Sequence, residues 1–98
     1  MNQPIQVRPE AEDDLAEAAL WYEAQRLGLG RRFLDEVEAV FAAIAERPLR
    51  FPPLHRQTRR ALLHRFPYGV YYLAEADRIV VVAVMHARRH PRRWRERT

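Results

Sequence analysis

Two stretches in the first half of the chain repeat apolar residues at the 3.6-residue spacing of an amphipathic helix. The first stretch opens at Pro9, and its apolar stripe consists of Ala11, Leu15, Ala18, Ala19 and Tyr22. The stripe of the second stretch consists of Phe33, Val37, Val40, Phe41 and Ile44. Gly28 and Gly30 bracket Leu29 in a predicted tight turn, and Pro48 marks the end of the second helix. A connection this short predicts an antiparallel helical hairpin.

Shorter apolar runs outside the hairpin predict strands. Ile5 and Val7 alternate with polar neighbours, which is typical of a short edge strand. After a proline-rich connector at residues 48–58, three further strand candidates cover residues 60–66, 70–74 and 79–85, with a hairpin turn predicted at residues 75–78. The run at 79–85 is apolar on both faces, so we expect it to be central. The hairpin should cover one of its faces, and the C-terminal tail or a partner chain the other.

These elements follow one another in the order β-α-α-β-β-β, which predicts an α+β fold. We expect an N-terminal edge strand, a two-helix antiparallel hairpin, a mainly antiparallel three-stranded sheet and a short basic C-terminal tail. A chain of 98 residues has room for one modest core, so residues 1–98 are predicted to form a single domain. The longest apolar run is too short to span a bilayer and residues 1–4 do not resemble a signal peptide, so we expect a cytoplasmic protein.

Charge is distributed unevenly along the chain. The chain has 17 arginines and no lysine. The planar guanidinium of arginine suits carboxylates and phosphates. Residues 1–49 carry five Arg and ten Asp or Glu, a net charge of −5, whereas residues 50–98 carry twelve Arg and three Asp or Glu, a net charge of +9. Six of those arginines lie in the last eleven residues. This asymmetry predicts a polyanionic partner, either nucleic acid or an acidic protein segment.

Several segments, taken in order, resemble the RelE/ParE superfamily of bacterial toxins. They are RPEAEDDL at 8–15, RRFLDEV at 31–37, RP at 47–48, RFPYGVYY at 65–72 and VMHARRHP at 84–91, followed by Trp94. The resemblance covers nearly the whole chain. It implies a compact growth-arresting toxin that a cognate antitoxin neutralises by wrapping an extended segment around it. It further implies a hetero-oligomer with the antitoxin and contact with operator DNA only through that complex.

The superfamily divides by mechanism. RelE-like members cleave mRNA, usually on the ribosome, whereas ParE-like members inhibit DNA gyrase and lack the nuclease residues. The long helical hairpin and the tail at residues 88–94 are more similar to the ParE branch, so we expect a non-enzymatic toxin directed at gyrase. A metal-independent mRNA endoribonuclease, and a non-toxic module that binds nucleic acid or protein on the same fold, are the open alternatives.

Cleavage of RNA without a metal requires a base, an acid and positive charge on the phosphate. For that activity we expect His86 to be the acid or base, because the imidazole pKa lies near neutrality, with Arg65 and Arg89 on the phosphate. RelE-like nucleases that this chain resembles often use lysines, and the sequence has none. No metal or cofactor is expected. His86 and His90 are four residues apart, but the preceding strand and Pro91 disfavour a helical metal pair.

For a toxin that acts by binding, we expect the target surface to lie on the sheet and tail. The predicted target-binding residues are Arg60, Tyr68, Tyr72, Arg88, Arg89, Arg92, Arg93 and Trp94. The antitoxin is predicted to bind along the hairpin at Trp21, Leu34 and Phe41 and to pair with an exposed sheet edge. Structural roles compete with these assignments: a strand-end hydrogen bond for His86, core packing for the tyrosines and a lid over the second sheet face for Trp94.

Overall fold

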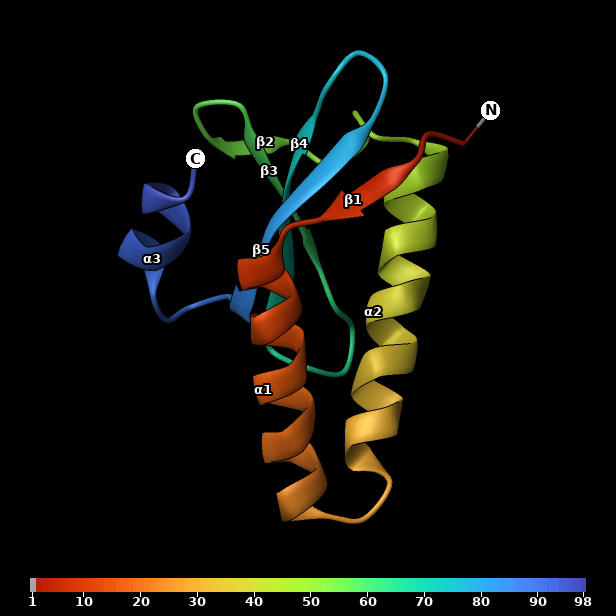
Figure 1. The fold of residues 1–98 in the computed structure, drawn as a ribbon, viewed down its shortest axis with the longest axis vertical. Coiled ribbons are helices and arrows are strands. Elements are labelled where there is room, and N and C mark those ends of the chain that lie inside the picture. The colour runs from red at the N-terminus through yellow and green to blue at the C-terminus, as the bar shows by residue number, and fades with distance from the viewer. Residues whose placement is uncertain (1) are drawn as a thin grey trace.

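The computed structural model describes residues 2–98, which form a five-stranded sheet, a long helical hairpin and a short C-terminal helix (Figure 1). The elements are β1 (Ile5–Val7), α1 (Pro9–Gln25), α2 (Leu29–Glu46), β2 (Pro53–His55), β3 (Thr58–Leu62), β4 (Tyr68–Ala74), β5 (Ile79–His86) and α3 (Pro91–Glu96). The predicted α+β class and the two-helix hairpin are confirmed. Within the described range, no helix has the length and apolar character needed to cross a membrane.

The sheet has the strand order β1-β5-β4-β3-β2. β1 lies at one edge and pairs with β5 in parallel, and the other three pairs are antiparallel, as the mainly antiparallel prediction requires. The predicted sheet was smaller because β2 lies in the proline-rich connector, where no strand was expected. β2 is an edge strand, and an edge tolerates Pro53 because its missing N–H is not needed on the solvent side.

β3 and β4 have different bounds from the predicted strands. β3 ends at Leu62 rather than running to residue 66, and β4 begins at Tyr68 rather than at Val70. The cause is a long-range contact: the Glu36 carboxylate on α2 accepts hydrogen bonds from the backbone N–H groups of His64 and Arg65. These bonds hold the chain in a turn at the point where an apolar pattern alone predicts continued pairing. The expected hairpin turn at 75–78 is present and is closed by the bond from Glu75 N–H to the Arg78 carbonyl (2.9 Å).

The turn between the helices uses its two glycines differently from the prediction. Gly28 has a φ of 89°, the left-handed conformation that glycine adopts without strain, and it reverses the chain. Gly30 is already inside α2, where a Cβ atom would lie 2.5 Å from the Ala19 carbonyl oxygen on α1. Glu23 then caps α2 by accepting hydrogen bonds from the N–H groups of Gly28 (2.9 Å) and Gly30 (3.0 Å). The hairpin therefore depends on close backbone contact as well as on apolar stripes.

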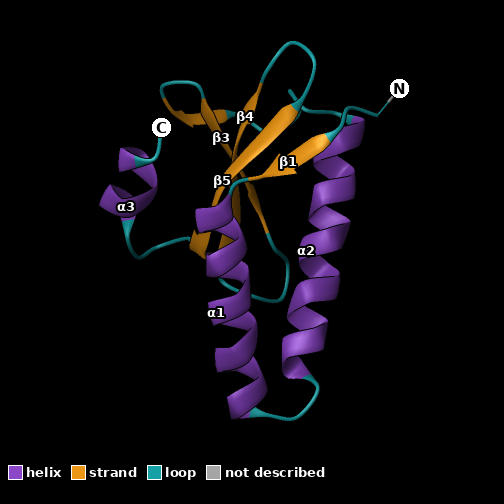
Figure 2. Cartoon of the chain, viewed as in Figure 1, coloured by secondary structure: helices purple, strands orange, loops and turns teal. Residues whose placement is uncertain are grey.

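Each face of the sheet has its own cover, and Figure 2 shows the hairpin helices and α3 as separate layers around it. The larger core lies between the sheet and the hairpin and includes Phe33, Ile44 and Tyr72. On the other face, Trp94 of α3 packs against Tyr71, Val82 and neighbouring side chains. β5 is buried along seven of its eight residues because both layers meet it. The C-terminal tail therefore covers the second face of β5, as one of the two predicted alternatives had it, and it does so as the helix α3.

Candidate functional site

α3 is held against the sheet by one large aromatic side chain. Trp94 is 3% exposed, and its ring stacks on Tyr71 with centroids 4.7 Å apart and an interplanar angle of 22°. The chain reaches this position because His90 takes a left-handed conformation (φ 57°) directly before Pro91 starts the helix. The burial of Trp94 fixes which side of α3 faces the sheet, and so leaves its arginines on the other side.

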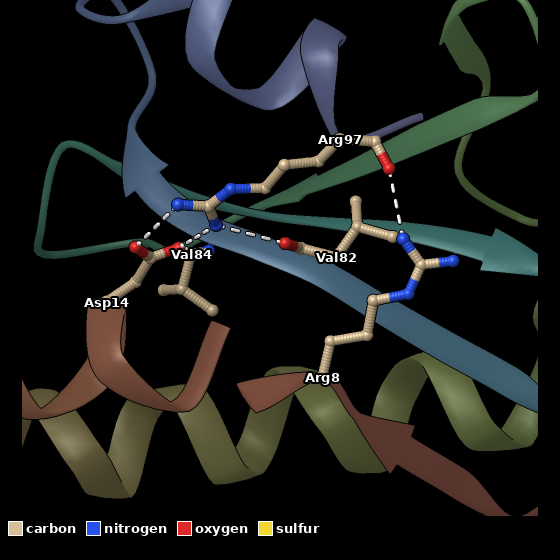
Figure 3. Close-up of polar contacts among 5 residues, drawn as sticks. All are labelled: Arg8, Asp14, Val82, Val84 and Arg97. Carbon is tan, nitrogen blue, oxygen red and sulfur yellow. Dashed lines mark hydrogen bonds and ion pairs between the residues drawn. The ribbon is translucent and has the colours of Figure 1, made fainter. Parts of the chain in front are cut away.

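A polar network ties the end of α3 to α1 and β5 (Figure 3). The Arg97 guanidinium donates to both carboxylate oxygens of Asp14 (2.7 and 3.2 Å) and to the Val82 carbonyl (3.1 Å). Asp14 also accepts the Val84 N–H (3.0 Å), and Arg8 donates to the Arg97 carbonyl (3.0 Å). The Asp14 and Arg97 side chains are only 9% and 17% exposed. Arg97 is therefore a structural residue, not part of a free basic arm.

The other arginines that follow β5 face solvent. Arg88, Arg89, Arg92 and Arg93 are all exposed, and none forms an ion pair within the part of the chain that the structure describes. We call this group the arginine cluster. Because unpaired guanidinium groups attract carboxylates and phosphates, the arginine cluster is a surface suited to a polyanionic partner.

An open cleft of about 350 Å³ lies beside the arginine cluster, between α1 and the end of β5. We call it the α1–β5 cleft. One wall comes from α1 and carries Asp14, Glu17, Trp21 and Tyr22, and the opposite wall carries Tyr68, His86, Arg89, His90 and Arg93. The cleft thus brings acidic, basic and aromatic side chains together from elements that are far apart in the sequence.

His86 is held as a neutral imidazole at the end of β5. Its Nδ1 accepts the backbone N–H of Arg88 (3.1 Å), so in the neutral ring the proton resides on Nε2. The pKa of His86 lies below its ordinary value because of partial burial and the positive charges of Arg89, His90 and Arg88. A neutral ring with Nδ1 occupied and Nε2 protonated has no free lone pair, which makes His86 a poor general base in this conformation.

Tyr22 on the α1 wall and Tyr68 on the opposite wall have ring centroids 5.9 Å apart. Burial raises the pKa of both phenols, and the nearby charge of Arg89 partly opposes that rise. Both hydroxyls therefore remain neutral at physiological pH. A neutral phenol can donate a hydrogen bond to an anion, so each wall of the cleft carries one further donor.

Two predicted target-binding residues lie in the interior and are unavailable to a partner in this fold. Tyr72 is fully buried, and its hydroxyl donates to the Pro48 carbonyl (2.6 Å), while burial raises its pKa to about 12. Trp94 is the lid described above. Arg60 is half-buried and donates to the Ala87 carbonyl (3.4 Å), so it supports the segment that carries the arginine cluster. Of the predicted tyrosines, Tyr68 lines the cleft.

The three residues predicted for RNA cleavage are not brought into one site. His86 and Arg89 line the α1–β5 cleft, whereas Arg65 lines a separate groove with Arg26, Arg32 and Glu36. Arg65 is displaced because Glu36 holds the turn before β4 against α2. The groups described between residues 2 and 98 include no cluster of three or more His, Asp or Glu side chains that could hold a metal ion.

The predicted antitoxin residues differ in exposure. Trp21 is 57% exposed on α1, whereas Leu34 and Phe41 are half-buried and pack against the main core. Sequence reasoning missed two other exposed apolar residues on this part of the hairpin, Leu20 (71%) and Leu27 (91%). Leu20 lies on α1 outside its apolar stripe, and Leu27 lies in the turn after α1. An apolar residue at such a position indicates an exposed contact, and this signal could have identified both.

Sequence reasoning also missed Asp14, Glu17 and Tyr22 as residues of the cleft. The sequence pattern predicts no site role for Asp14 or Glu17, and it places Tyr22 in the apolar stripe of the first helix. Their proximity to His86 and Arg89 depends on α1 packing against β5, which no local pattern contains.

Comparison with known proteins decides the family. A family model described as the ParE toxin of the type II toxin–antitoxin system parDE matches residues 5–91. The chain belongs to the ParE toxin family. No curated protein sequence gives a significant match. The matched span ends at residue 91, so most of α3, including Arg93 and Trp94, lies beyond it, as does Arg97 after the helix.

Two solved structures are similar to this ParE family member in fold. The chromosomal ParDE toxin–antitoxin system from P. aeruginosa aligns with a TM-score of 0.71 and 13% identity, covering 86% of this chain and 95% of that one. The toxin–antitoxin complex RelBE2 from Mycobacterium tuberculosis aligns with a TM-score of 0.63 and 22% identity, covering 88% of this chain and 99% of that one. At these identities the likeness establishes the fold, and it agrees with the RelE/ParE resemblance of the sequence.

Proposed function

We propose that this chain is the toxin of a type II toxin–antitoxin pair and arrests growth by binding DNA gyrase in the cytoplasm. The match to the ParE family over residues 5–91 carries the toxin assignment. The exposed arginine cluster supports action by binding, because it offers fixed positive charge beside a protein–DNA target. Inhibition of this kind needs a rigid surface and no catalytic residue.

The direct test combines purified full-length protein with gyrase and relaxed plasmid. We expect supercoiling to stop or cleaved DNA to accumulate as the protein is added. Arg92→Gln/Arg93→Gln should lose this effect, because these two arginines of α3 are exposed members of the arginine cluster. The matched control is Arg47→Gln/Arg50→Gln, which removes two exposed arginines from the end of α2 and the connector. Normal supercoiling at a large excess of folded protein over gyrase would overturn the gyrase assignment.

RNA cleavage is the second candidate, and one observation favours it: His86, Arg89 and Tyr68 share the α1–β5 cleft. Against it stand the protonated Nε2 of His86 and the separate location of Arg65. His86→Ala distinguishes the two mechanisms, with His64→Ala as a control at an exposed histidine outside the cleft. If growth arrest persists in His86→Ala, and primer extension detects no new transcript ends, the nuclease mechanism is excluded.

A cognate antitoxin is the proposed partner, and the complex rather than the free toxin is expected to contact operator DNA. We place the antitoxin helix on the exposed apolar residues Leu20, Trp21 and Leu27 of the hairpin, where an apolar segment would bury otherwise solvated surface. Co-expression with the neighbouring gene should restore growth to cells that produce the toxin. Leu20→Asn/Leu27→Asn should remain toxic but escape neutralisation, whereas Leu49→Asn/Leu54→Asn, at exposed connector positions, should still be neutralised. Neutralisation of both variants alike would place the antitoxin elsewhere.

A further inference from the structure

The α1–β5 cleft contains hydrogen-bond donors on Tyr22 and Tyr68 to which the proposed gyrase and antitoxin surfaces assign no role. The Tyr72 hydroxyl is satisfied by the Pro48 carbonyl, but the hydroxyls of Tyr22 and Tyr68 have no hydrogen-bond partner among residues 2–98. Their rings are 5.9 Å apart, and the charge of Arg89 acts on both phenols. Two neutral phenols and a guanidinium therefore line one cavity.

The basic wall of the cleft favours an anion at this position. Arg89 and Arg93 both line the cavity, and neither forms an ion pair in the described part of the chain. The Nε2–H of His86 adds a further donor, because its Nδ1 is already occupied by the Arg88 N–H. A guanidinium binds a carboxylate or a phosphate through paired N–H donors, but a phosphate monoester has three terminal oxygens and can therefore engage both arginines at once.

Trp21 and Glu17, on the opposite wall, narrow the class of ligand. The Trp21 indole lines the cavity and is 57% exposed, an arrangement typical of a stacking platform for a planar ring. Glu17 lines the same wall and also forms no ion pair among residues 2–98, so its carboxylate can accept a hydrogen bond from a ligand amine. The volume of about 350 Å³ is larger than a bare phosphate needs and falls in the range of small-molecule sites, roughly 300–1,000 Å³.

We propose that the α1–β5 cleft binds a nucleoside monophosphate unit, with its phosphate on Arg89 and Arg93 and its base stacked on Trp21. Glu17 accepts a hydrogen bond from an exocyclic amino group and so favours adenine over uracil. A free nucleotide and an unpaired nucleotide of a single strand present the same chemistry. An acidic peptide supplies the negative charge but no ring for the indole. This site goes beyond gyrase inhibition: it shares Arg93 with the arginine cluster and Trp21 with the proposed antitoxin surface, but nucleotide binding is measured on the purified chain without gyrase or antitoxin.

The two tryptophans make the test specific. Trp94 is 3% exposed because it packs between α3 and the sheet, so a ligand in solution contacts Trp21 and not Trp94. Trp21→Phe removes the reporter and should abolish the quenching. The purified full chain is titrated with AMP, UMP, inorganic phosphate, a single-stranded hexa-deoxyadenylate and a hexaglutamate peptide. We expect AMP to quench saturably. Arg93→Gln should weaken AMP binding about tenfold, the loss of one charge-assisted contact to phosphate. Glu17→Gln should weaken AMP binding more than UMP binding.

Arg95→Gln is the matched control for Arg93→Gln, since Arg95 lies on the same helix, is exposed and does not line the cleft. Its affinity for AMP should match that of the unchanged protein, and the melting temperature of each variant shows that it folds. Tighter binding of the hexanucleotide identifies a strand as the natural source, and equal binding identifies a free nucleotide. Absence of saturable quenching overturns the site. So does equal competition by inorganic phosphate or hexaglutamate, which would leave an anion site or a peptide site.

Discussion

Removal of the Asp14 carboxylate tests how α3 is attached. Asp14 accepts three hydrogen bonds, two from Arg97 (2.7 and 3.2 Å) and one from the Val84 N–H (3.0 Å). In Asp14→Ala all three donors lose their partner, and the Arg97 charge stays in a site where its side chain is only 17% exposed. Breaking a fully buried ion pair in this way costs roughly 3–5 kcal/mol.

The expected loss for Asp14→Ala lies below that range. Arg97 keeps its bond to the Val82 carbonyl (3.1 Å), and its partial exposure lets water reach the guanidinium. We therefore expect a decrease of about 2–3 kcal/mol in the free energy of unfolding. Small domains are stable by only about 5–15 kcal/mol, and this loss corresponds to a fall of roughly 10–20 °C in melting temperature.

Urea unfolding followed by circular dichroism and tryptophan fluorescence measures this loss. Asp13→Ala is the control, because Asp13 is the exposed neighbour on the same helix and should change stability by less than about 0.5 kcal/mol. The double variant Asp14→Ala/Arg97→Met removes the unpaired charge as well, so it should be no less stable than Asp14→Ala alone. Equal effects of Asp13→Ala and Asp14→Ala, or strictly additive losses in the double variant, would refute the assignment of Asp14 as the anchor of Arg97.

Three further predictions, two substitutions and one titration, concern other parts of the structure. Gly30→Ala places a Cβ 2.5 Å from the Ala19 carbonyl oxygen and should lower stability by about 1–3 kcal/mol in thermal denaturation, whereas an open helical site would gain from the same change. Trp94→Ala should cost about 3–5 kcal/mol and remove near-ultraviolet dichroism from the Tyr71 stack, and unchanged stability would mean that α3 does not cover the sheet. Titration of His86 by NMR should have its midpoint below 6.5, because burial and Arg89 lower its pKa. Since folding favours its neutral form, the contribution of His86 to stability falls as the pH drops through that lowered pKa.

The elements with strong periodicity could be predicted from the sequence. The apolar stripe of residues 33–44 gave α2, and the run at 79–85 gave a buried strand covered on both faces, because one-dimensional pattern and burial coincide there. β2 was missed because Pro53 argues against a strand, and only its position at the sheet edge makes the proline acceptable. The early end of β3 depends on Glu36, which is 28 residues from His64 in the sequence.

Only the part of the candidate site that lies within one stretch of sequence could be predicted. The exposed arginines of residues 88–93 follow from composition, and Tyr68 was predicted as a target-binding residue although the strand that it begins was predicted to start at Val70. Tyr72 and Trp94 are predicted to bind the target, with core packing and a lid as the competing roles, because the sequence around an aromatic residue looks the same whether it binds a partner or covers a core. What separates the two cases is the packing of α3 on Tyr71, a contact that no spacing within residues 88–94 reveals.

Within residues 2–98, one ion pair joins the acidic first half of the chain to the basic second half. Of the acidic residues on α1, only Asp14 forms an ion pair among residues 2–98, and its partner is Arg97 at the far end of the chain. That pair, together with Trp94, fixes α3, while Glu17 on α1 and Arg89 beyond β5 line opposite walls of a cleft without pairing. Glu17 and Arg89 are both exposed, and exposed opposite charges gain little from pairing because water solvates them. The Asp14–Arg97 pair differs because both side chains are largely withdrawn from water, which is why this pair and not the others is expected to govern the attachment of α3.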